Sequence, residues 1–218
     1  MTAIRGAIID VDGTLLDSMA IWDKVAVDYL ISNGVQPSED LNDKLLGMGG
    51  HEIPNYFKNQ YGIKGSSEDI QKGINKLLED FYYFKAPLKA GVAGFLDELR
   101  SRGIKMCIAT ATDRHLIEAA LKRCGIYDYF ERIFTCGEEK TSKSNPEIYF
   151  KAADYLGVDI SQTLVAEDAF YAIKTAKEAG FFVIGVFDRA EEDQQEAIKQ
   201  ICNVYCRTLE EFVLEDCR

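Results

Sequence analysis

Basic residues are scarce in this chain relative to acidic ones. Its 218 residues include 25 Lys and Arg against 36 Asp and Glu, which gives a formal net charge of −11 at pH 7. A surface of this sign gains nothing from the phosphates of nucleic acids or from anionic lipid headgroups. We therefore expect no nucleic acid and no membrane among its partners. An anionic substrate would have to be captured by positive charge placed locally.

Histidine and long apolar runs are scarce as well. The two imidazoles, those of His51 and His115, give little support for a zinc site, although the chain has six cysteines. A chain of this length buries a core without disulfides, so we expect reduced thiols. No apolar run approaches the roughly 20 residues that span a bilayer, and residues 1–5 do not resemble a signal peptide. We expect a soluble, cytoplasmic and monomeric protein.

Short apolar runs alternate with helical patterns through most of the chain. The runs, which are typical of strands buried on both faces of a parallel sheet, lie at 7–9, 104–109, 132–135, 163–166 and 182–186. Helical patterns, each followed by a glycine, lie at 92–102, 114–124, 146–156 and 170–179. This alternation predicts an α/β fold with a doubly wound, Rossmann-like parallel sheet.

One long stretch breaks the alternation. Residues 17–86 hold no convincing strand and carry apolar residues at helical spacing, which predicts several amphipathic helices. We therefore expect an α/β core from residues 1–16 and 87–218, with an inserted all-α cap domain over residues 17–86. The return connection, residues 85–91, contains a proline and a glycine that interrupt helical continuity.

Two aspartates follow the first predicted strand. Asp10 and Asp12 stand where open α/β sheets place their ligand crevice, and strand alternation points both to the same side. Carboxylates so placed repel each other unless a cation or a shared proton lies between them, and Mg²⁺ prefers such oxygen ligands. An acidic loop that merely ends a strand is the structural alternative for this motif alone.

The next three strand ends also carry chemical groups. Thr110 follows the second strand, Lys143 lies in the loop after the third, and Glu167 and Asp168 follow the fourth. A phosphate site with its metal needs acids for the cation, and a hydroxyl and an ammonium for the phosphoryl oxygens. The four strand ends together therefore favour a phosphate site over the acidic-loop alternative.

On these motifs the chain resembles the haloacid dehalogenase superfamily, in its β-phosphoglucomutase-like phosphatase branch with an inserted helical cap. The resemblance covers essentially the whole chain, and the first motif is matched by Asp10-x-Asp12-Gly13-Thr14. It implies that Asp10 is the nucleophile that becomes a phosphoaspartate. It also implies that Asp12 is the general acid/base, which protonates the leaving oxygen and later activates water.

The same resemblance assigns the remaining motif residues. It implies that Thr110 and Lys143 bind the transferring phosphoryl group. It further implies that Mg²⁺ is held by Asp10, by the main-chain carbonyl of Asp12, and by Glu167 and Asp168. The sequence departs from the family pattern after Lys143, where Ser144-Asn145-Pro146 stands in place of the more common and more rigid Pro-x-Pro.

The resemblance implies a Mg²⁺-dependent phosphatase of a small phosphomonoester, such as a sugar phosphate, with a cap that closes over the site. The main alternative is a phosphosugar mutase of the β-phosphoglucomutase type. The position of the mutase cap histidine corresponds to Trp22, and residues 45–51 lack the arginine that a mutase uses for its distal phosphate. These absences favour hydrolysis. A non-catalytic protein that binds a phosphometabolite is a further alternative.

Three more residues are candidates for substrate binding. Trp22 and His51 lie in the expected cap, and Arg114 closely follows Thr110. Each has a structural alternative, because Trp22 is typical of cap packing, His51 of a surface position, and Arg114 of a helix cap or an ion pair.

Overall fold

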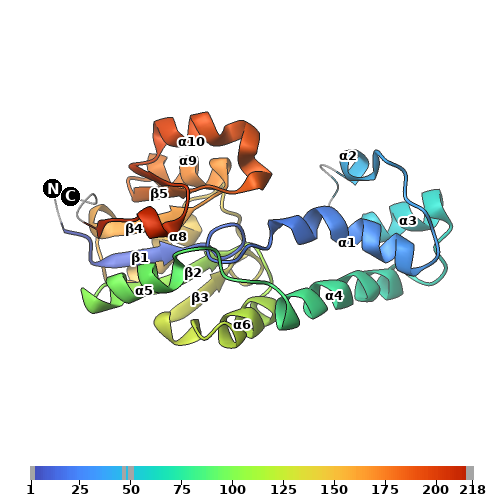
Figure 1. Ribbon diagram of the computed structural model, residues 1–218, viewed down its shortest axis with the longest axis horizontal. Coiled ribbons are helices and arrows are strands. Elements are labelled where there is room, and N and C mark those ends of the chain that lie inside the picture. The colour runs from blue at the N-terminus through green and yellow to red at the C-terminus, as the bar shows by residue number, and fades with distance from the viewer. Residues whose placement is uncertain (1–2, 46–47, 49–51, 215–218) are drawn as a thin grey trace. The chain divides into compact units, whose positions relative to one another are not determined.

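The computed structural model describes residues 3–45, 48 and 52–214 (Figure 1). The chain forms two compact units. One contains Met1–Met19 and Ala86–Arg218, and the other contains Ala20–Lys85. The first is an α/β unit and the second is helical.

The α/β unit is built on a six-stranded sheet with strand order β3-β2-β1-β4-β5-β6, in which every neighbouring pair is parallel. The predicted doubly wound α/β fold is confirmed. The strands are β1 (Gly6–Ile9), β2 (Lys105–Thr110), β3 (Arg132–Thr135), β4 (Thr163–Glu167), β5 (Phe182–Val186) and β6 (Val204–Cys206). The chain leaves β1 toward β2 and β3 on one side and returns to β4, β5 and β6 on the other, so β1 lies at the switch point of the sheet.

Helices cover both faces of the sheet. The core on one face combines Ile8, Cys107 and Val165 of the central strands with residues of α8, α9 and α10. Helices α5 and α6 lie on the other side of the sheet (Figure 1). The helices of this unit are α5 (Val92–Ser101), α6 (Arg114–Arg123), α7 (Cys136–Glu139), α8 (Glu147–Leu156), α9 (Phe170–Glu178) and α10 (Gln195–Ile201). Short 3-10 helices are Tyr127–Tyr129, Ile160–Gln162, Arg189–Gln194 and Leu209–Glu211.

The helical unit contains no strand among its described residues. Its helices are α1 (Met19–Ser32), α2 (Leu41–Leu45), α3 (Ile53–Tyr61) and α4 (Ser67–Phe84). A capping box of Ser66 and Asp69 starts α4, and the stacked rings of Tyr29 and Phe57, 5.9 Å apart, lie in the unit's core. Of the helices that the structure describes, none combines the length and the apolar composition needed to cross a membrane.

The segments that leave and re-enter the α/β unit pair with each other. Leu16 and Leu88 form an antiparallel bridge, the Asp17 amide donates to the Pro87 carbonyl at 3.0 Å, and the Lys89 amide donates to the Leu15 carbonyl at 2.9 Å. This pairing fixes the backbone of Lys89 beside the loop that follows β1.

Candidate active site

The carboxyl edge of the sheet gathers the predicted motifs. Asp10 directly follows β1, Thr110 is the last residue of β2, and Glu167 is the last residue of β4. Ile9 is in register with Ile108 of β2 and with Ala166 of β4, so the ends of the three strands lie side by side. The Asp10 amide also donates to the Ala166 carbonyl at 3.0 Å, which extends the pairing up to the nucleophile candidate.

Lys143 joins two of these carboxylates. Its buried ammonium donates to Oδ1 of Asp10 and to Oε1 of Glu167, the latter at 2.5 Å. Burial alone disfavours the charged amine, but the Asp10 and Glu167 carboxylates outweigh it and raise the pKa of Lys143 well above its usual value. The side chain therefore keeps its positive charge at this edge of the sheet.

Asp10, Glu167 and Asp168 form a buried cluster in which one carboxylate oxygen from each residue lies within 4.8 Å of the other two. Burial raises the pKa of Asp10 against the opposing effect of Lys143, and burial together with Glu167 raises the pKa of Asp168. With all three acids ionised, one ammonium leaves the cluster two negative charges in excess. A divalent cation matches that charge, and hard oxygen donors suit Mg²⁺. The residues present fit the metal.

The two oxygens of Glu167 already have protein partners. Oε1 accepts from Lys143, while Oε2 accepts from the amides of Asp168 and Ala169 at 2.8 and 3.0 Å. These bonds turn the side chain back onto the start of α9 and orient it beside Asp168. Because each oxygen has further lone-pair capacity, Glu167 can still reach a cation directly or through water.

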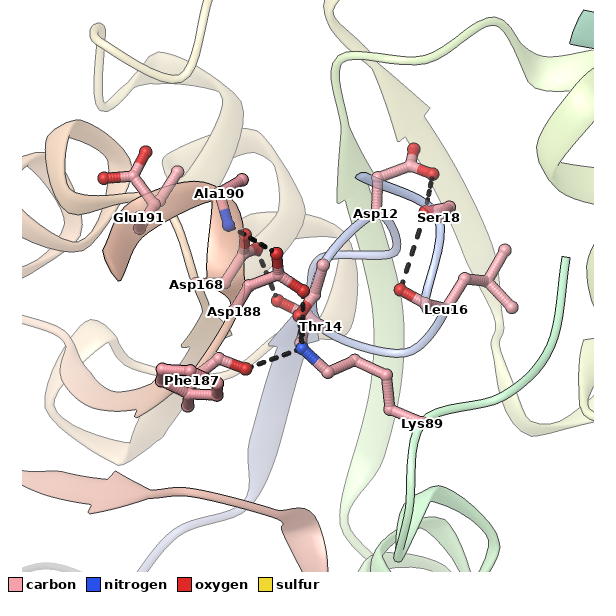
Figure 2. A network of polar contacts seen from close by, with 12 residues as sticks. Asp12, Thr14, Leu16, Ser18, Lys89, Asp168, Phe187, Asp188, Ala190 and Glu191 are labelled. Carbon is pink, nitrogen blue, oxygen red and sulfur yellow. Dashed lines mark hydrogen bonds and ion pairs between the residues drawn. The ribbon is translucent and has the colours of Figure 1, made fainter. Parts of the chain in front are cut away.

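Gly13 and Thr14 hold the loop after β1 against Asp168. The Thr14 hydroxyl donates to Oδ1 of Asp168 at 2.9 Å (Figure 2). Gly13 has a φ of +84°, and a Cβ on it would lie 2.2 Å from Oδ2 of Asp168. The backbone therefore approaches this carboxylate more closely than any side-chain-bearing residue allows.

Asp12 stands apart from the metal-type cluster. Its Oδ1 accepts a 2.5 Å hydrogen bond from the hydroxyl of Ser18, which is fully buried (Figure 2). Among the described residues, the acids that could share one cation are Asp10, Glu167 and Asp168, because β4 ends beside β1 and brings its acids to the same edge. The prediction that a cation or a shared proton lies between Asp10 and Asp12 stays a prediction.

Thr110 is buried at the end of β2, and its Oγ1 accepts a hydrogen bond from the Thr112 amide at 3.1 Å. That bond fixes the position of the hydroxyl oxygen without using the hydroxyl hydrogen, which can donate to an anion.

Of the three secondary candidates, the structure describes Arg114 and Trp22. The Arg114 guanidinium donates to Glu138 at 2.5 and 2.7 Å and to the Ile133 carbonyl at 2.7 Å, in line with the ion-pair alternative. Trp22 lies in α1 with 40% of its surface exposed. His51 lies outside the described residues. Their role in substrate binding stays a prediction.

Two residues near the site were not predicted from the sequence. Ser18 bonds Asp12, and its signal was available, because it is a hydroxyl six residues after the aspartate at the start of a helix. Lys89 donates to the Gly13 carbonyl at 2.5 Å, across 76 residues of chain. No pattern in the sequence connects these two positions.

Comparison with known proteins decides the family. The model of the haloacid dehalogenase-like hydrolases matches residues 4–180. The chain belongs to this family. The motifs that carried the resemblance are thus those of a haloacid dehalogenase-like hydrolase, and the chain is a hydrolase by family.

Relatives of this haloacid dehalogenase-like hydrolase include named phosphatases. The phosphorylated carbohydrates phosphatase of Thermotoga maritima is 26% identical over 177 residues, which cover 81% of this chain and 82% of that protein. Hexitol phosphatase B of Escherichia coli O157:H7 is 26% identical over 215 residues, 98% of this chain and 96% of that protein. A crystal structure of beta-phosphoglucomutase from Clostridium difficile matches with a TM-score of 0.70 at 22% identity, covering 97% of this chain and 94% of that one. At that identity the structural match establishes the fold alone.

Proposed function

We propose that this hydrolase is a Mg²⁺-dependent phosphatase that cleaves a small phosphomonoester through a phosphoaspartate on Asp10. The observation that carries the proposal is the buried group in which Asp10 lies against Lys143 and beside Glu167 and Asp168. Such a group combines a carboxylate nucleophile, a fixed ammonium and an excess of negative charge that suits a divalent cation.

In the proposed reaction, an oxygen of Asp10 attacks phosphorus, and the bond from phosphorus to the substrate's alcohol oxygen breaks. Lys143 and the Thr110 hydroxyl bind the non-bridging phosphoryl oxygens, and Lys143 also balances the charge of Asp10. The metal, when held by Asp10, Asp168, Glu167 and the Asp12 carbonyl, supplies neutralisation of the charge on the phosphoryl group. Splitting one displacement into two steps lowers the barrier to each.

Asp12 is the proposed general acid and base. It donates a proton to the leaving alcohol oxygen and then removes a proton from the water that attacks the phosphoaspartate, which regenerates Asp10 and releases phosphate. The hydrogen bond from Ser18 supports this role, because it restricts the orientation of the Asp12 carboxyl group.

For the substrate we propose a phosphorylated sugar or a related small metabolite. The support is the naming of the relatives as phosphatases of phosphorylated carbohydrates and hexitols. The mutase alternative has support from the fold, which is shared with beta-phosphoglucomutase. Trp22 at the place of the mutase histidine, and the lack of arginine at 45–51, favour hydrolysis.

Phosphate release from a panel of small phosphomonoesters, with Mg²⁺ or with EDTA, tests the proposal. The panel includes hexitol phosphates and β-glucose 1-phosphate, with glucose 6-phosphate measured in parallel. We expect Mg²⁺-dependent release of phosphate. Glucose 6-phosphate formed without net release would make the protein a mutase. No turnover of any substrate would favour the non-catalytic binding protein.

A further inference from the structure

Lys89 makes an ion pair and two carbonyl contacts beside the proposed active site. Its Nζ donates to the Phe187 carbonyl at 2.6 Å and to Oδ2 of Asp188 at 2.8 Å (Figure 2). It also donates to the Gly13 carbonyl at 2.5 Å. The side chain is 15% exposed and that of Asp188 is 7% exposed. The three donors of the ammonium are thus matched by three acceptors. We call this group the Lys89 clamp.

Both sides of the Lys89 clamp are fixed by further hydrogen bonds. The Lys89 backbone is held by the Leu15 carbonyl. Asp188 directly follows the loop residue after β5, and its Oδ1 accepts from the Ala190 amide at 3.0 Å. The Gln195 side chain donates to the Asp188 carbonyl at 3.2 Å. The clamp therefore connects two anchored segments with the loop after β1.

Gly13 is the member of the clamp that lies closest to the chemistry. Its carbonyl accepts from Lys89, while its Cα faces Oδ2 of Asp168 so closely that a Cβ would lie 2.2 Å away. The next residue, Thr14, donates to the other oxygen of the same carboxylate. A shift of the Gly13–Thr14 peptide would therefore move the backbone and the hydroxyl group that contact the Asp168 carboxylate.

We propose that Lys89 is a positioning residue for the metal site: through Gly13 it fixes the backbone that orients Asp168. This inference rests on the proposed function, because it assumes that Asp168 is a ligand of the divalent cation. Groups that orient metal ligands without touching the metal commonly change metal affinity by about 10–100-fold when removed.

The sign of the effect separates positioning from simple electrostatics. Removing the Lys89 ammonium makes the region more negative by one charge, and Coulomb attraction alone would then strengthen cation binding. Positioning predicts the opposite, weaker binding, because the Gly13 carbonyl loses its donor. A variant that removes both charges of the ion pair keeps the net charge of the region and isolates the loss of the clamp.

Mn²⁺ binding, measured by electron paramagnetic resonance without substrate, tests this proposal. The samples are the unsubstituted protein, Lys89→Met, the double variant Lys89→Met/Asp188→Asn, and Asp168→Asn as a control for the site. Lys105→Met is the matched control. Lys105 also donates to a main-chain carbonyl, that of Leu156 at 2.9 Å, but it is the first residue of β2, at the end of the strand opposite Thr110. We expect Lys89→Met and the double variant to bind Mn²⁺ roughly tenfold more weakly or worse, with Lys105→Met unchanged.

Equal or tighter Mn²⁺ binding by folded Lys89→Met would overturn the positioning role and leave the metal site intact. Absence of binding to the unsubstituted protein would contradict the metal site itself, and the inference with it. Circular dichroism checks folding, and the double variant, which leaves no unpaired Asp188 carboxylate, keeps the test open if Lys89→Met does not fold. If neither variant folds, the Lys89 clamp serves stability and the proposal is overturned.

Discussion

The buried charges at the carboxyl edge of the sheet compensate one another only in part. Lys143 contacts Asp10 and Glu167, while Asp168 receives a hydrogen bond from the neutral Thr14 hydroxyl. An ionised carboxylate that is buried without a counter-charge is costly, and a second acid beside it adds repulsion. The uncompensated charge is therefore the physical reason to expect a divalent cation at these three acids.

Ser18 provides a test at the scale of one hydrogen bond. We expect Ser18→Ala to lower kcat about 10- to 150-fold, since a hydrogen bond to a charged group contributes about 1.5–3 kcal/mol and 1.36 kcal/mol corresponds to a factor of ten. KM should change less, because the proposed role of Asp12 is to act on the leaving oxygen and not to bind the substrate. Steady-state kinetics on the best substrate measure both constants.

Two further variants control for the loss of a serine hydroxyl. Ser18→Thr retains the hydroxyl and should keep most of kcat. Ser101→Ala removes a hydroxyl that donates to the Glu98 carbonyl on an exposed helix end, and it should leave kcat unchanged. An unaltered kcat in Ser18→Ala would exclude Ser18 from orienting the general acid.

At the scale of elements, the loop after β1 determines how closely the residues that follow β1 approach Asp168, which follows β4. Gly13 adopts a positive φ and makes contact with Asp168, and Thr14 adds a hydrogen bond to the same side chain. β1 and β4 are neighbours in the sheet, so this loop and the end of β4 face each other over a short distance. The close approach leaves no room for a methyl group.

Gly13→Ala should therefore destabilise the fold by more than backbone strain alone. A left-handed conformation costs a non-glycine residue about 1–2 kcal/mol. Gly125 has a φ of +73°, and a methyl group added there would meet nothing within 4 Å, so Gly125→Ala measures that strain by itself. We expect a larger loss of unfolding free energy in Gly13→Ala, measured by denaturant titration. Equal losses would show that the contact with Asp168 is readily relieved.

The elements of the α/β unit were largely predictable, and the contacts between distant loops were not. The strands at 132–135 and 182–186 have the predicted bounds, because continuous apolar runs between turns mark buried parallel strands. β6 is three residues long and too short to give such a pattern. Lys89 escaped prediction because its partners follow other strands, and only the strand order brings them together.

The motif residues Asp10, Lys143, Glu167 and Asp168 do lie together, as the strand-end argument requires. That argument works because parallel strands place all their carboxyl ends at one edge. The strand pattern does not specify which of the acids share the cluster. In the structure, Asp12 accepts a hydrogen bond from Ser18 and lies outside the cluster of Asp10, Glu167 and Asp168.

At the scale of the whole molecule, a formal charge of −11 coexists with a buried acidic cluster. A cation that binds the folded state at this cluster, and does not bind the unfolded chain, stabilises the protein by mass action. The stabilisation should depend on the buried acids and not on the surface charge, because exposed carboxylates hold divalent cations weakly and are screened by salt.

Thermal unfolding with and without Mg²⁺ measures this stabilisation. At a free concentration 100 times the Kd, binding contributes about 2.7 kcal/mol, and we expect a rise in Tm of about 5–10 °C. Asp168→Asn should lose most of the shift, whereas Asp154→Asn, on the exposed side of α8, should retain it. The same Tm rise in Asp168→Asn would place the stabilising cation elsewhere.

The central claim is that Asp10 becomes phosphorylated during turnover. Borohydride reduces an acyl phosphate but not a free carboxylate, so reaction with borohydride during turnover converts a phosphorylated aspartate to homoserine. Mass spectrometry of the peptide that contains Asp10 measures this change, with Asp10→Asn as the control. The account predicts homoserine at position 10 only when both substrate and Mg²⁺ are present. Rapid phosphate release without any modification of that peptide would contradict it.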